Sequence, residues 1–300
     1  MKAIGKEMDK TTGGALRILD KSLNHPRILD LCCAPGGFLA TTLGINPGAQ
    51  ARGISLPVDK GGHKVRLPEH SNVTIDFLDI TMLAADMGAT EIPPEHADVA
   101  NFLPRHFDRE QFFDLVVCDG QILRKHNRAD YRKRREPRRL TLTQFAIGLE
   151  HLRPAGTMVI LLHKPESPDT MQWLYVFSKF SSVQLFKPVK HHVKRSSCYM
   201  IATNVQTQCP DALEAVETWK NQWQVATFGT DTEYEEDLRA EYLNVEMVLK
   251  EFGPELVKLG KEIWAIQARG LSKASFMKNP SKASFVKKQA ANDRLAGQWR

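Results

Sequence analysis

Four apolar runs of this 300-residue chain end in, or are followed by, a polar residue. The types and spacing of these four polar side chains could support chemistry. Asp30 ends the first run, and Asp79, Asp119 and Lys164 follow three later ones. The carboxyl ends of parallel strands line the ligand crevice of an open α/β sheet, so we expect these side chains to meet there. A carboxylate in such a crevice can accept hydrogen bonds from an adenine amino group or an ammonium group. Taken singly, each carboxylate could instead cap a helix or be a satisfied buried group.

The turn Ala34–Gly37 lies directly after the first of these runs and before a helix-like segment that starts at Phe38. Its two glycines let the backbone approach a ligand closely, as nucleotide-like cofactors require at the mouth of an α/β sheet. The turn is not the G-x-G-x-x-G dinucleotide fingerprint, because Cys32, Ala34 and Pro35 stand where that motif needs glycine or free backbone. A strand–turn–helix corner without a ligand is the alternative interpretation.

Apolar runs that alternate with helix-like segments predict an α/β fold with a mostly parallel, doubly wound sheet. The expected strands are 27–31, 51–56, 73–77, 112–118 and 157–163, followed by a close-spaced pair, 183–186 and 199–203, that supplies an antiparallel edge. The expected helices are 1–25, with Gly13-Gly14 as a possible break, 38–43, 141–152 and 168–180. Beyond Gln208 the chain becomes charge-rich with helical apolar spacing. We therefore predict a domain over 1–205, a helical extension over 206–270 and a basic, disordered tail over 271–300.

The run Asp30-Leu-Cys-Cys-Ala-Pro-Gly-Gly37 resembles the S-adenosylmethionine-binding loop of the FtsJ/RrmJ family of RNA ribose 2′-O-methyltransferases. The resemblance covers residues 1–205 and implies a Rossmann-like methyltransferase fold with S-adenosylmethionine as the cofactor. It also implies that Asp79 hydrogen-bonds the adenine, while Ser55 stands where an acidic residue often holds the cofactor ribose. The cofactor-binding residues predicted in this way are Asp30, Cys32, Ala34, Pro35, Gly36, Gly37, Phe38, Ser55, Asp79 and Asp119.

Catalysis in that family rests on a Lys-Asp-Lys-Glu tetrad around the transferred methyl group. By resemblance Asp119 matches the aspartate, Lys164 the second lysine, and Lys10 (or Lys6) the first lysine. The position of the glutamate is Ser197 in this sequence, which departs from the family pattern. A lysine in a partly desolvated pocket near a second cation has a lowered pKa and can orient or deprotonate a ribose hydroxyl. An exposed lysine that simply ends a strand is the alternative for Lys164.

Basic residues concentrate between positions 124 and 139, where nine Lys and Arg stand against two acidic residues. This block has a net charge of +7 within a chain of net charge +6, so the basic character is local. A second cationic loop covers 187–195. Two cationic loops beside one pocket suit a polyanion such as RNA, and Tyr131 could stack on a base; a solvated helix surface is the alternative for the block. The predicted RNA-binding residues are Arg124, Lys125, Arg128, Tyr131, Arg132, Lys133, Arg134, Arg135, Arg138, Arg139, Lys190, Lys194 and Arg195.

Composition narrows the remaining possibilities. Hydrophobic residues make up 42% of the chain and charged residues 25%, and no apolar run approaches the ~18 residues needed to cross a membrane. The first residues lack a secretory signal, and the five cysteines show no zinc-like spacing. These features fit an intracellular, reducing compartment and do not distinguish nucleus, cytoplasm and mitochondrion. His191-His192 lies among cations and is interpreted as part of the cationic loop, so no metal is expected.

Three functional hypotheses follow. The first is an S-adenosylmethionine-dependent methyltransferase that acts on RNA at a ribose 2′-hydroxyl. The second, motivated by Ser197, is a pseudo-methyltransferase that binds the cofactor or RNA without efficient transfer. The third is methylation of a small molecule or a protein. Methylation of exocyclic amines is disfavoured, because Gly-Gln follows Asp119 where that chemistry uses Pro-Pro-Tyr or Pro-Pro-Trp.

Overall fold

A seven-stranded sheet with the order β3-β2-β1-β4-β5-β7-β6 organises the molecule. The computed structural model describes residues 1–19, 25–67, 71–122, 126, 128–242 and 245–272. β7 pairs antiparallel with both β5 and β6, whereas the pairings from β3 to β5 are all parallel. This confirms the predicted fold class. The strands are β1 (Arg27–Asp30), β2 (Gln50–Ser55), β3 (Val73–Phe77), β4 (Phe113–Cys118), β5 (Leu152–His163), β6 (Ser182–Phe186) and β7 (Ser197–Val205).

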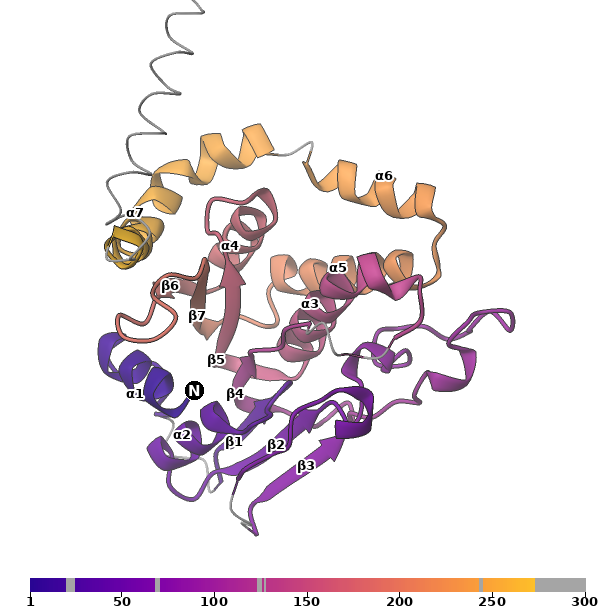
Figure 1. Ribbon diagram of the computed structural model, residues 1–300, viewed down its shortest axis with the longest axis horizontal. Coiled ribbons are helices and arrows are strands. Elements are labelled where there is room, and N and C mark those ends of the chain that lie inside the picture. The colour runs from indigo at the N-terminus through magenta and orange to yellow at the C-terminus, as the bar shows by residue number, and fades with distance from the viewer. Residues whose placement is uncertain (20–24, 68–70, 123–125, 127, 243–244, 273–300) are drawn as a thin grey trace, which may run out of the picture.

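Helices cover both faces of this sheet (Figure 1). One face carries α1 and α2, and the other carries α3, α4 and α5. Short 3₁₀ turns lie at Val58–Lys60, Ile80–Met82 and Val99–Asn101. The helices are α1 (Lys2–Thr11), α2 (Gly37–Ile45), α3 (Arg132–Glu150), α4 (Pro168–Phe180), α5 (Pro210–Phe228), α6 (Asp231–Tyr242) and α7 (Val245–Ser272).

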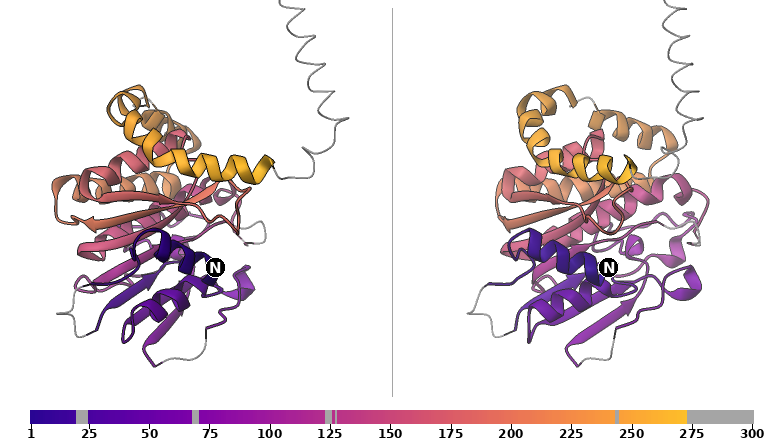
Figure 2. Two further views of the ribbon diagram at one scale, coloured as in Figure 1. Left: turned by 90° about the vertical axis from the view of Figure 1, so that its left-hand side faces the viewer. Right: turned by 60° about the vertical axis from the view of Figure 1, so that its left-hand side comes forward.

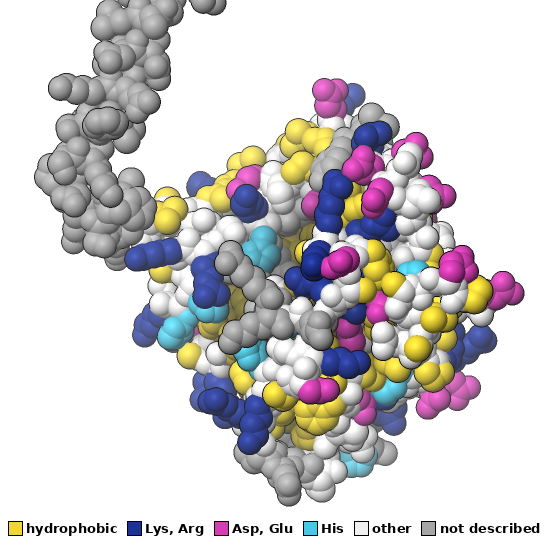
Figure 3. All heavy atoms as spheres, turned by 45° about the vertical axis from the view of Figure 1, so that its right-hand side comes forward, with side chains coloured by type: hydrophobic (Ala, Val, Ile, Leu, Met, Phe, Trp, Pro, Cys, Tyr) yellow, Lys and Arg dark blue, Asp and Glu magenta, His cyan; other side chains and the backbone are white. Residues whose placement is uncertain are grey.

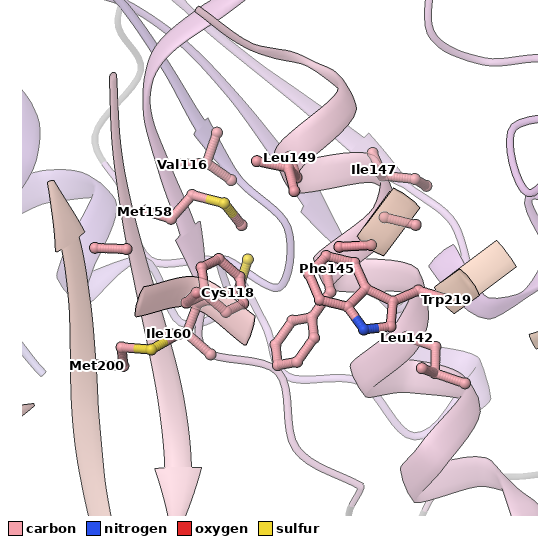
Figure 4. Packing of buried hydrophobic residues seen from close by; sticks show 14 of the residues in the cluster. Val116, Cys118, Leu142, Phe145, Ile147, Leu149, Met158, Ile160, Met200 and Trp219 are labelled. Atoms are coloured by element: carbon pink, nitrogen blue, oxygen red, sulfur yellow. The ribbon is translucent and has the colours of Figure 1, made fainter. Parts of the chain in front are cut away.

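Strand residues alternate between two apolar clusters, one on each face of the sheet. In β4, Leu115 and Val117 join the cluster under α1 and α2, whereas Val116 and Cys118 join the cluster under α3. This alternation is the period of two that an extended strand imposes, and burial on both faces explains the uninterrupted apolar runs. Figure 4 shows Phe145 of α3 and Trp219 of α5 packed beside Cys118, with ring centroids of the two aromatic side chains 5.2 Å apart.

The C-terminal segment adds helices to the α3 side of the molecule. Trp219 and Trp223 of α5 are buried in the same cluster as the central strands. Figure 2 shows α7 beside α4 and β6, where Phe252 and Leu256 are buried. The predicted helical extension is therefore present, and the predicted tail 273–300 lies outside the described residues. Among the described residues, none of the helices combines the length and apolarity that crossing a bilayer requires.

Two helices have other boundaries than the longest segments that the sequence allows. The first helix ends at Thr11, before the break expected at Gly13-Gly14, because both glycines adopt positive φ angles, 71° and 89°, that a helix does not allow. α3 begins at Arg132 instead of Thr141 and continues through Pro137. An interior proline costs a helix ~3 kcal/mol, and the buried ion pair between Glu136 and Arg139 links the residues on either side of this proline.

Candidate active site

The turn Ala34–Gly37 connects β1 to α2 with a close backbone approach. Gly36 has a φ of 99°, in the left-handed region that a side chain disfavours, and a Cβ at this position would lie 2.6 Å from Leu67 Cγ. Gly37 starts α2, and a Cβ here would collide with the Met1 side chain. The glycines of the motif are thus required by the turn and its packing. Ala34 and Pro35 of the same turn line a cavity.

A cavity of ≈ 290 Å³ lies at the carboxyl ends of the central strands. The strand order reverses between β1 and β4, which is the point where open α/β sheets bind ligands. Of the predicted cofactor-binding residues, those that line the cavity are Cys32, Ala34, Pro35, Ser55, Asp79 and Asp119. Asp30, Gly36, Gly37 and Phe38 do not line it: Asp30 is buried, and the Phe38 ring packs edge-on against Tyr199, 5.3 Å between centroids.

Asp79 is held by a buried ion-pair network on one wall of this cavity. Arg132 Nη2 donates to Asp79 Oδ2 at 2.6 Å, and Thr81 donates to Asp79 Oδ1 through its backbone nitrogen and its hydroxyl. Arg132 also contacts Glu136, which accepts a further hydrogen bond from Arg139 at 2.7 Å. Burial alone would raise the pKa of Asp79, but Arg132 and Thr81 hold it below its ordinary value. Asp79 is therefore an ionised acceptor beside the cavity.

Asp119 and Asp30 form a second acidic region, in which neither carboxylate forms an ion pair with a described side chain. Burial raises the pKa of Asp119 to about 7, although Tyr199, whose hydroxyl donates to Asp119 at 3.3 Å, and the N-terminal ammonium group oppose this. Burial and the nearby Asp119 raise the pKa of Asp30 to about 8. No salt bridge of the described chain involves either carboxylate. Such a pair favours a ligand that brings positive charge into the cavity.

The end of β5 differs from the prediction. Lys164 is exposed, adopts a φ of 48° where the chain leaves the strand, and does not line the cavity. It borders an adjoining hollow of ≈ 360 Å³ instead. Because side chains alternate along a strand, Leu161 and His163 share the face that points to the cavity, and both line it. Lys164 was predicted because it is the polar residue that follows the apolar run. The prediction did not consider that side chains alternate along a strand, although the sequence contains that pattern.

Of the remaining predicted catalytic residues, Ser197 lines the cavity and Lys10 does not. Ser197 lines the cavity, directly across from His163 in the β5–β7 pairing. Lys10 is exposed in the last turn of α1, whereas Met1, at the opposite end of this helix, is the α1-side residue that lines the cavity. With a rise of ~1.5 Å per residue, nine residues of helix separate Lys10 from the cavity by ~13 Å. No lysine is among the described residues that line the cavity.

The arginines of the predicted basic block lie largely inside the fold. Arg132 and Arg139 belong to the buried network under Asp79. Arg135 is also buried and contacts Asp231 of α6, and Arg138 pairs with Asp237 of the same helix at 3.1 Å. The prediction that these four arginines form an exposed cationic loop was wrong. No local pattern predicts that the acidic helix α6 lies against them.

Other cations of the two basic segments are placed at the surface. Arg128, His192 and Arg195 line the cavity. Lys133, Arg134, Lys190 and Lys194 are exposed, and Tyr131 packs edge-on against His96, 4.9 Å between centroids. Arg124 and Lys125 lie outside the described residues. On the face in Figure 3, Lys and Arg side chains (dark blue) and His side chains (cyan) lie on several sides of the centre.

The lining of the cavity fits S-adenosylmethionine. In the part of the chain that is described, no group of three or more His, Cys, Asp or Glu side chains gathers as metal ligands would. Leu31, Leu78 and Ile80 give the cavity an apolar wall suited to a purine, beside the acceptor Asp79. Asp119 forms no ion pair with a described side chain, so it can accept a sulfonium or an ammonium group. These features define an α/β protein with a pocket for a cationic nucleoside cofactor.

Comparison with known proteins gives the family. Residues 6–205 match the FtsJ-like methyltransferase family, and the chain belongs to it. S-adenosylmethionine is the methyl donor of FtsJ-like methyltransferases. No curated protein matches this chain.

Solved structures similar to the chain include three methyltransferases. A ribosomal RNA methyltransferase from Plasmodium falciparum is 16% identical, with 67% of this chain and 94% of that chain covered and a TM-score of 0.40. An rRNA methylase from Streptococcus thermophilus is 9% identical, with 66% and 96% covered and a TM-score of 0.36. Human methyltransferase-like protein 13 in complex with SAH is 11% identical, with 78% and 91% covered and a TM-score of 0.39.

Proposed function

We propose that this protein transfers the methyl group of S-adenosylmethionine to a ribose 2′-hydroxyl of RNA. One observation carries the proposal: a single cavity combines the Ala34–Pro35 turn with Asp79 and Asp119, and Arg128 and Arg195 also line it. The turn and the two carboxylates suit the cofactor. The arginines suit the phosphates of a polyanion that must reach the same cavity.

Each part of the cavity has a distinct task in this proposal. Asp79, kept ionised by Arg132, accepts hydrogen bonds from the adenine amino group. Asp119, once ionised, balances the positive charge of the cofactor. When bound, S-adenosylmethionine supplies an electrophilic methyl group, so positioning of the acceptor hydroxyl carries much of the catalysis.

Leu161 and Ser197 favour a second candidate function. Both line the cavity near Asp119, and neither can remove a proton from a hydroxyl as a lysine or a glutamate could. A protein that binds the cofactor and RNA without turnover would keep the residues that suit the cofactor. It would not need a proton acceptor at the positions of Leu161 and Ser197.

Purified protein incubated with methyl-tritiated S-adenosylmethionine and total cellular RNA separates the two candidates. The first predicts tritium in RNA, recovered after alkaline hydrolysis as dinucleotides that resist cleavage because their 2′-oxygen is methylated. The Asp119→Asn variant should lose this label, whereas Asp59→Asn, an exposed carboxylate outside the cavity, should retain it. Calorimetric binding of the cofactor without label in RNA or in added protein would establish the second candidate instead. Label in alkali-sensitive positions or in protein would contradict the ribose assignment.

A further inference from the structure

The proton acceptor of this site has not yet been identified, because no lysine is among the described residues that line the cavity. The inference that follows rests on the proposed function. We propose that His163 takes the place of the missing lysine and accepts the proton of the acceptor hydroxyl through its Nε2 atom.

The position of His163 is the first argument. It is the last residue of β5 and lies opposite Ser197 of β7, while Leu161, two residues earlier, lies opposite Tyr199. Directly opposed side chains of an antiparallel pair have Cβ atoms ~5 Å apart. His163 therefore stands next to the position that departs from the family pattern, on the sheet face that leads to Asp119 through Tyr199.

His163 also stands where the cofactor cavity meets open surface. It lines the cavity of ≈ 290 Å³ and the adjoining hollow of ≈ 360 Å³. Gly120, Gln121 and Leu161 border both spaces as well. An acceptor nucleotide that enters through the hollow would pass His163 before it reaches the cofactor. Lys164 borders only the hollow, so His163 is the residue of this strand end that faces both reactants.

The Nε2 atom of His163 has one polar neighbour. It lies 2.6 Å from Nε2 of the exposed Gln121 side chain, and which of the two atoms donates depends on the imidazole tautomer. In the neutral tautomer with its proton on Nδ1, the imidazole Nε2 accepts a hydrogen bond, and a hydroxyl of the acceptor can take the place of the Gln121 amide. This tautomer is the form that general-base catalysis at Nε2 requires.

The charges around His163 favour this neutral form. Partial burial and the cations Lys187 and Arg195, from the segment between β6 and β7, lower its pKa below the ordinary value. Lys187 is itself buried and donates to the carbonyl oxygens of Arg195 and Ser197, so it is fixed beside this strand end. Asp119, Tyr199 and His192 also line the cavity, and the N-terminal ammonium group acts on Asp119 and His192.

The step balances with the groups present. The hydroxyl oxygen forms its new bond to the methyl carbon as the bond from that carbon to sulfur breaks, and the electron pair stays on sulfur. The hydroxyl proton passes to His163 Nε2, and the resulting imidazolium returns it to solvent through the open hollow. General bases typically contribute ~10²–10⁴-fold to a rate.

The test compares His163→Asn and His163→Gln with a matched control, His25→Asn, which changes an exposed histidine outside the cavity. Each protein is assayed with tritiated S-adenosylmethionine and total cellular RNA from pH 5 to 9. We expect about a 100-fold or larger loss of kcat in both His163 variants, together with loss of the acidic limb of the pH profile. Cofactor affinity and thermal midpoint should stay as in the wild type. In the wild type, ¹⁵N NMR of the His163 ring should show the Nδ1-protonated tautomer and a pKa below 6.5.

Three results would overturn the inference in distinguishable ways. If the wild type transfers methyl groups and both His163 variants keep its kcat and acidic limb, His163 is not the proton acceptor and the proposed function stands. An Nε2-protonated ring at neutral pH would reject the acceptor role on spectroscopic grounds alone. If the wild type binds the cofactor but methylates no RNA, the proposed function fails and the role of His163 fails with it.

Discussion

The two walls of the cavity differ in whether their carboxylates are paired with cationic side chains. On the β3 and α3 side, Asp79 and Glu136 are matched by Arg132 and Arg139 in a buried network of short hydrogen bonds. On the β4 and β5 side, Asp119 receives a hydrogen bond of 3.3 Å from Tyr199, and the N-terminal ammonium group lowers its pKa, but no described side chain forms an ion pair with it. The carboxylates of the first wall are paired without a ligand. Asp119 of the second wall can still pair with a cationic ligand.

This contrast separates what holds the cofactor from what performs the transfer. A buried, fully paired carboxylate has a fixed position and a fixed protonation state, as recognition of an adenine edge requires. A buried, unpaired carboxylate instead has a raised pKa and responds to the charge of its ligand. The predictions below test the two walls separately.

The largest expected effect is on the paired wall. Arg132→Met leaves Asp79 and Glu136 buried without their shared cation, which should cost about 3–5 kcal/mol of unfolding free energy. The matched control is Lys133→Met, which removes an exposed cation from the neighbouring position of the same helix. Urea denaturation followed by circular dichroism measures both. Equal urea midpoints for the two variants would mean that the buried network does not stabilise the fold.

The unpaired wall should make cofactor binding depend on pH. Below about pH 7, Asp119 is protonated in the free protein, and Asp30 is protonated below about pH 8. A cationic ligand favours the ionised carboxylate, so the affinity for S-adenosylmethionine should rise with pH from 6 to 8, by up to about tenfold per pH unit for each linked proton.

S-adenosylhomocysteine, whose sulfur is neutral, is the control for this linkage and should show a weaker pH dependence. Calorimetry in buffers of different ionisation enthalpy measures the protons released as each ligand binds. Asp119→Asn should reduce the proton release on binding of S-adenosylmethionine. Identical proton release for the two ligands would refute the interpretation of this wall as a partner for the sulfonium charge.

Surface cations should have a smaller effect, confined to RNA. The double variant Lys190→Glu and Lys194→Glu reverses two exposed charges close in sequence to Arg195, which lines the cavity. RNA affinity at low salt should fall several-fold, and the dependence of log affinity on log salt should flatten by about 0.7 for each lost phosphate contact with a single strand. Lys179→Glu, in the last turn of α4, is the matched control. A similar loss of RNA affinity in the control would assign the effect to net charge.

The sequence predicted the fold and one wall of the site because both depend on local patterns. Apolar runs predicted the mostly parallel sheet with its antiparallel edge, and the predicted residues Ala34, Pro35, Asp79 and Asp119 line one cavity, since strand ends converge in an open sheet. The basic block was misread, because its burial depends on Asp231 and Asp237, about a hundred residues later in the chain. No local pattern encodes that contact.

The last prediction concerns the end of β5. There the residue type favours Lys164 as the proton acceptor, whereas the geometry of the strand favours His163. Lys164 has the residue type expected of a proton acceptor, but its left-handed backbone turns it away from the cavity and toward the adjoining hollow. Lys164→Ala should therefore change cofactor affinity by less than about twofold and kcat by less than about threefold, the scale of an exposed substitution. Tritium transfer to total RNA and calorimetry, run beside the His163 variants, measure both quantities. A loss of kcat as large as that of His163→Asn would show that residue type, and not the alternation along β5, identifies the catalytic residue here.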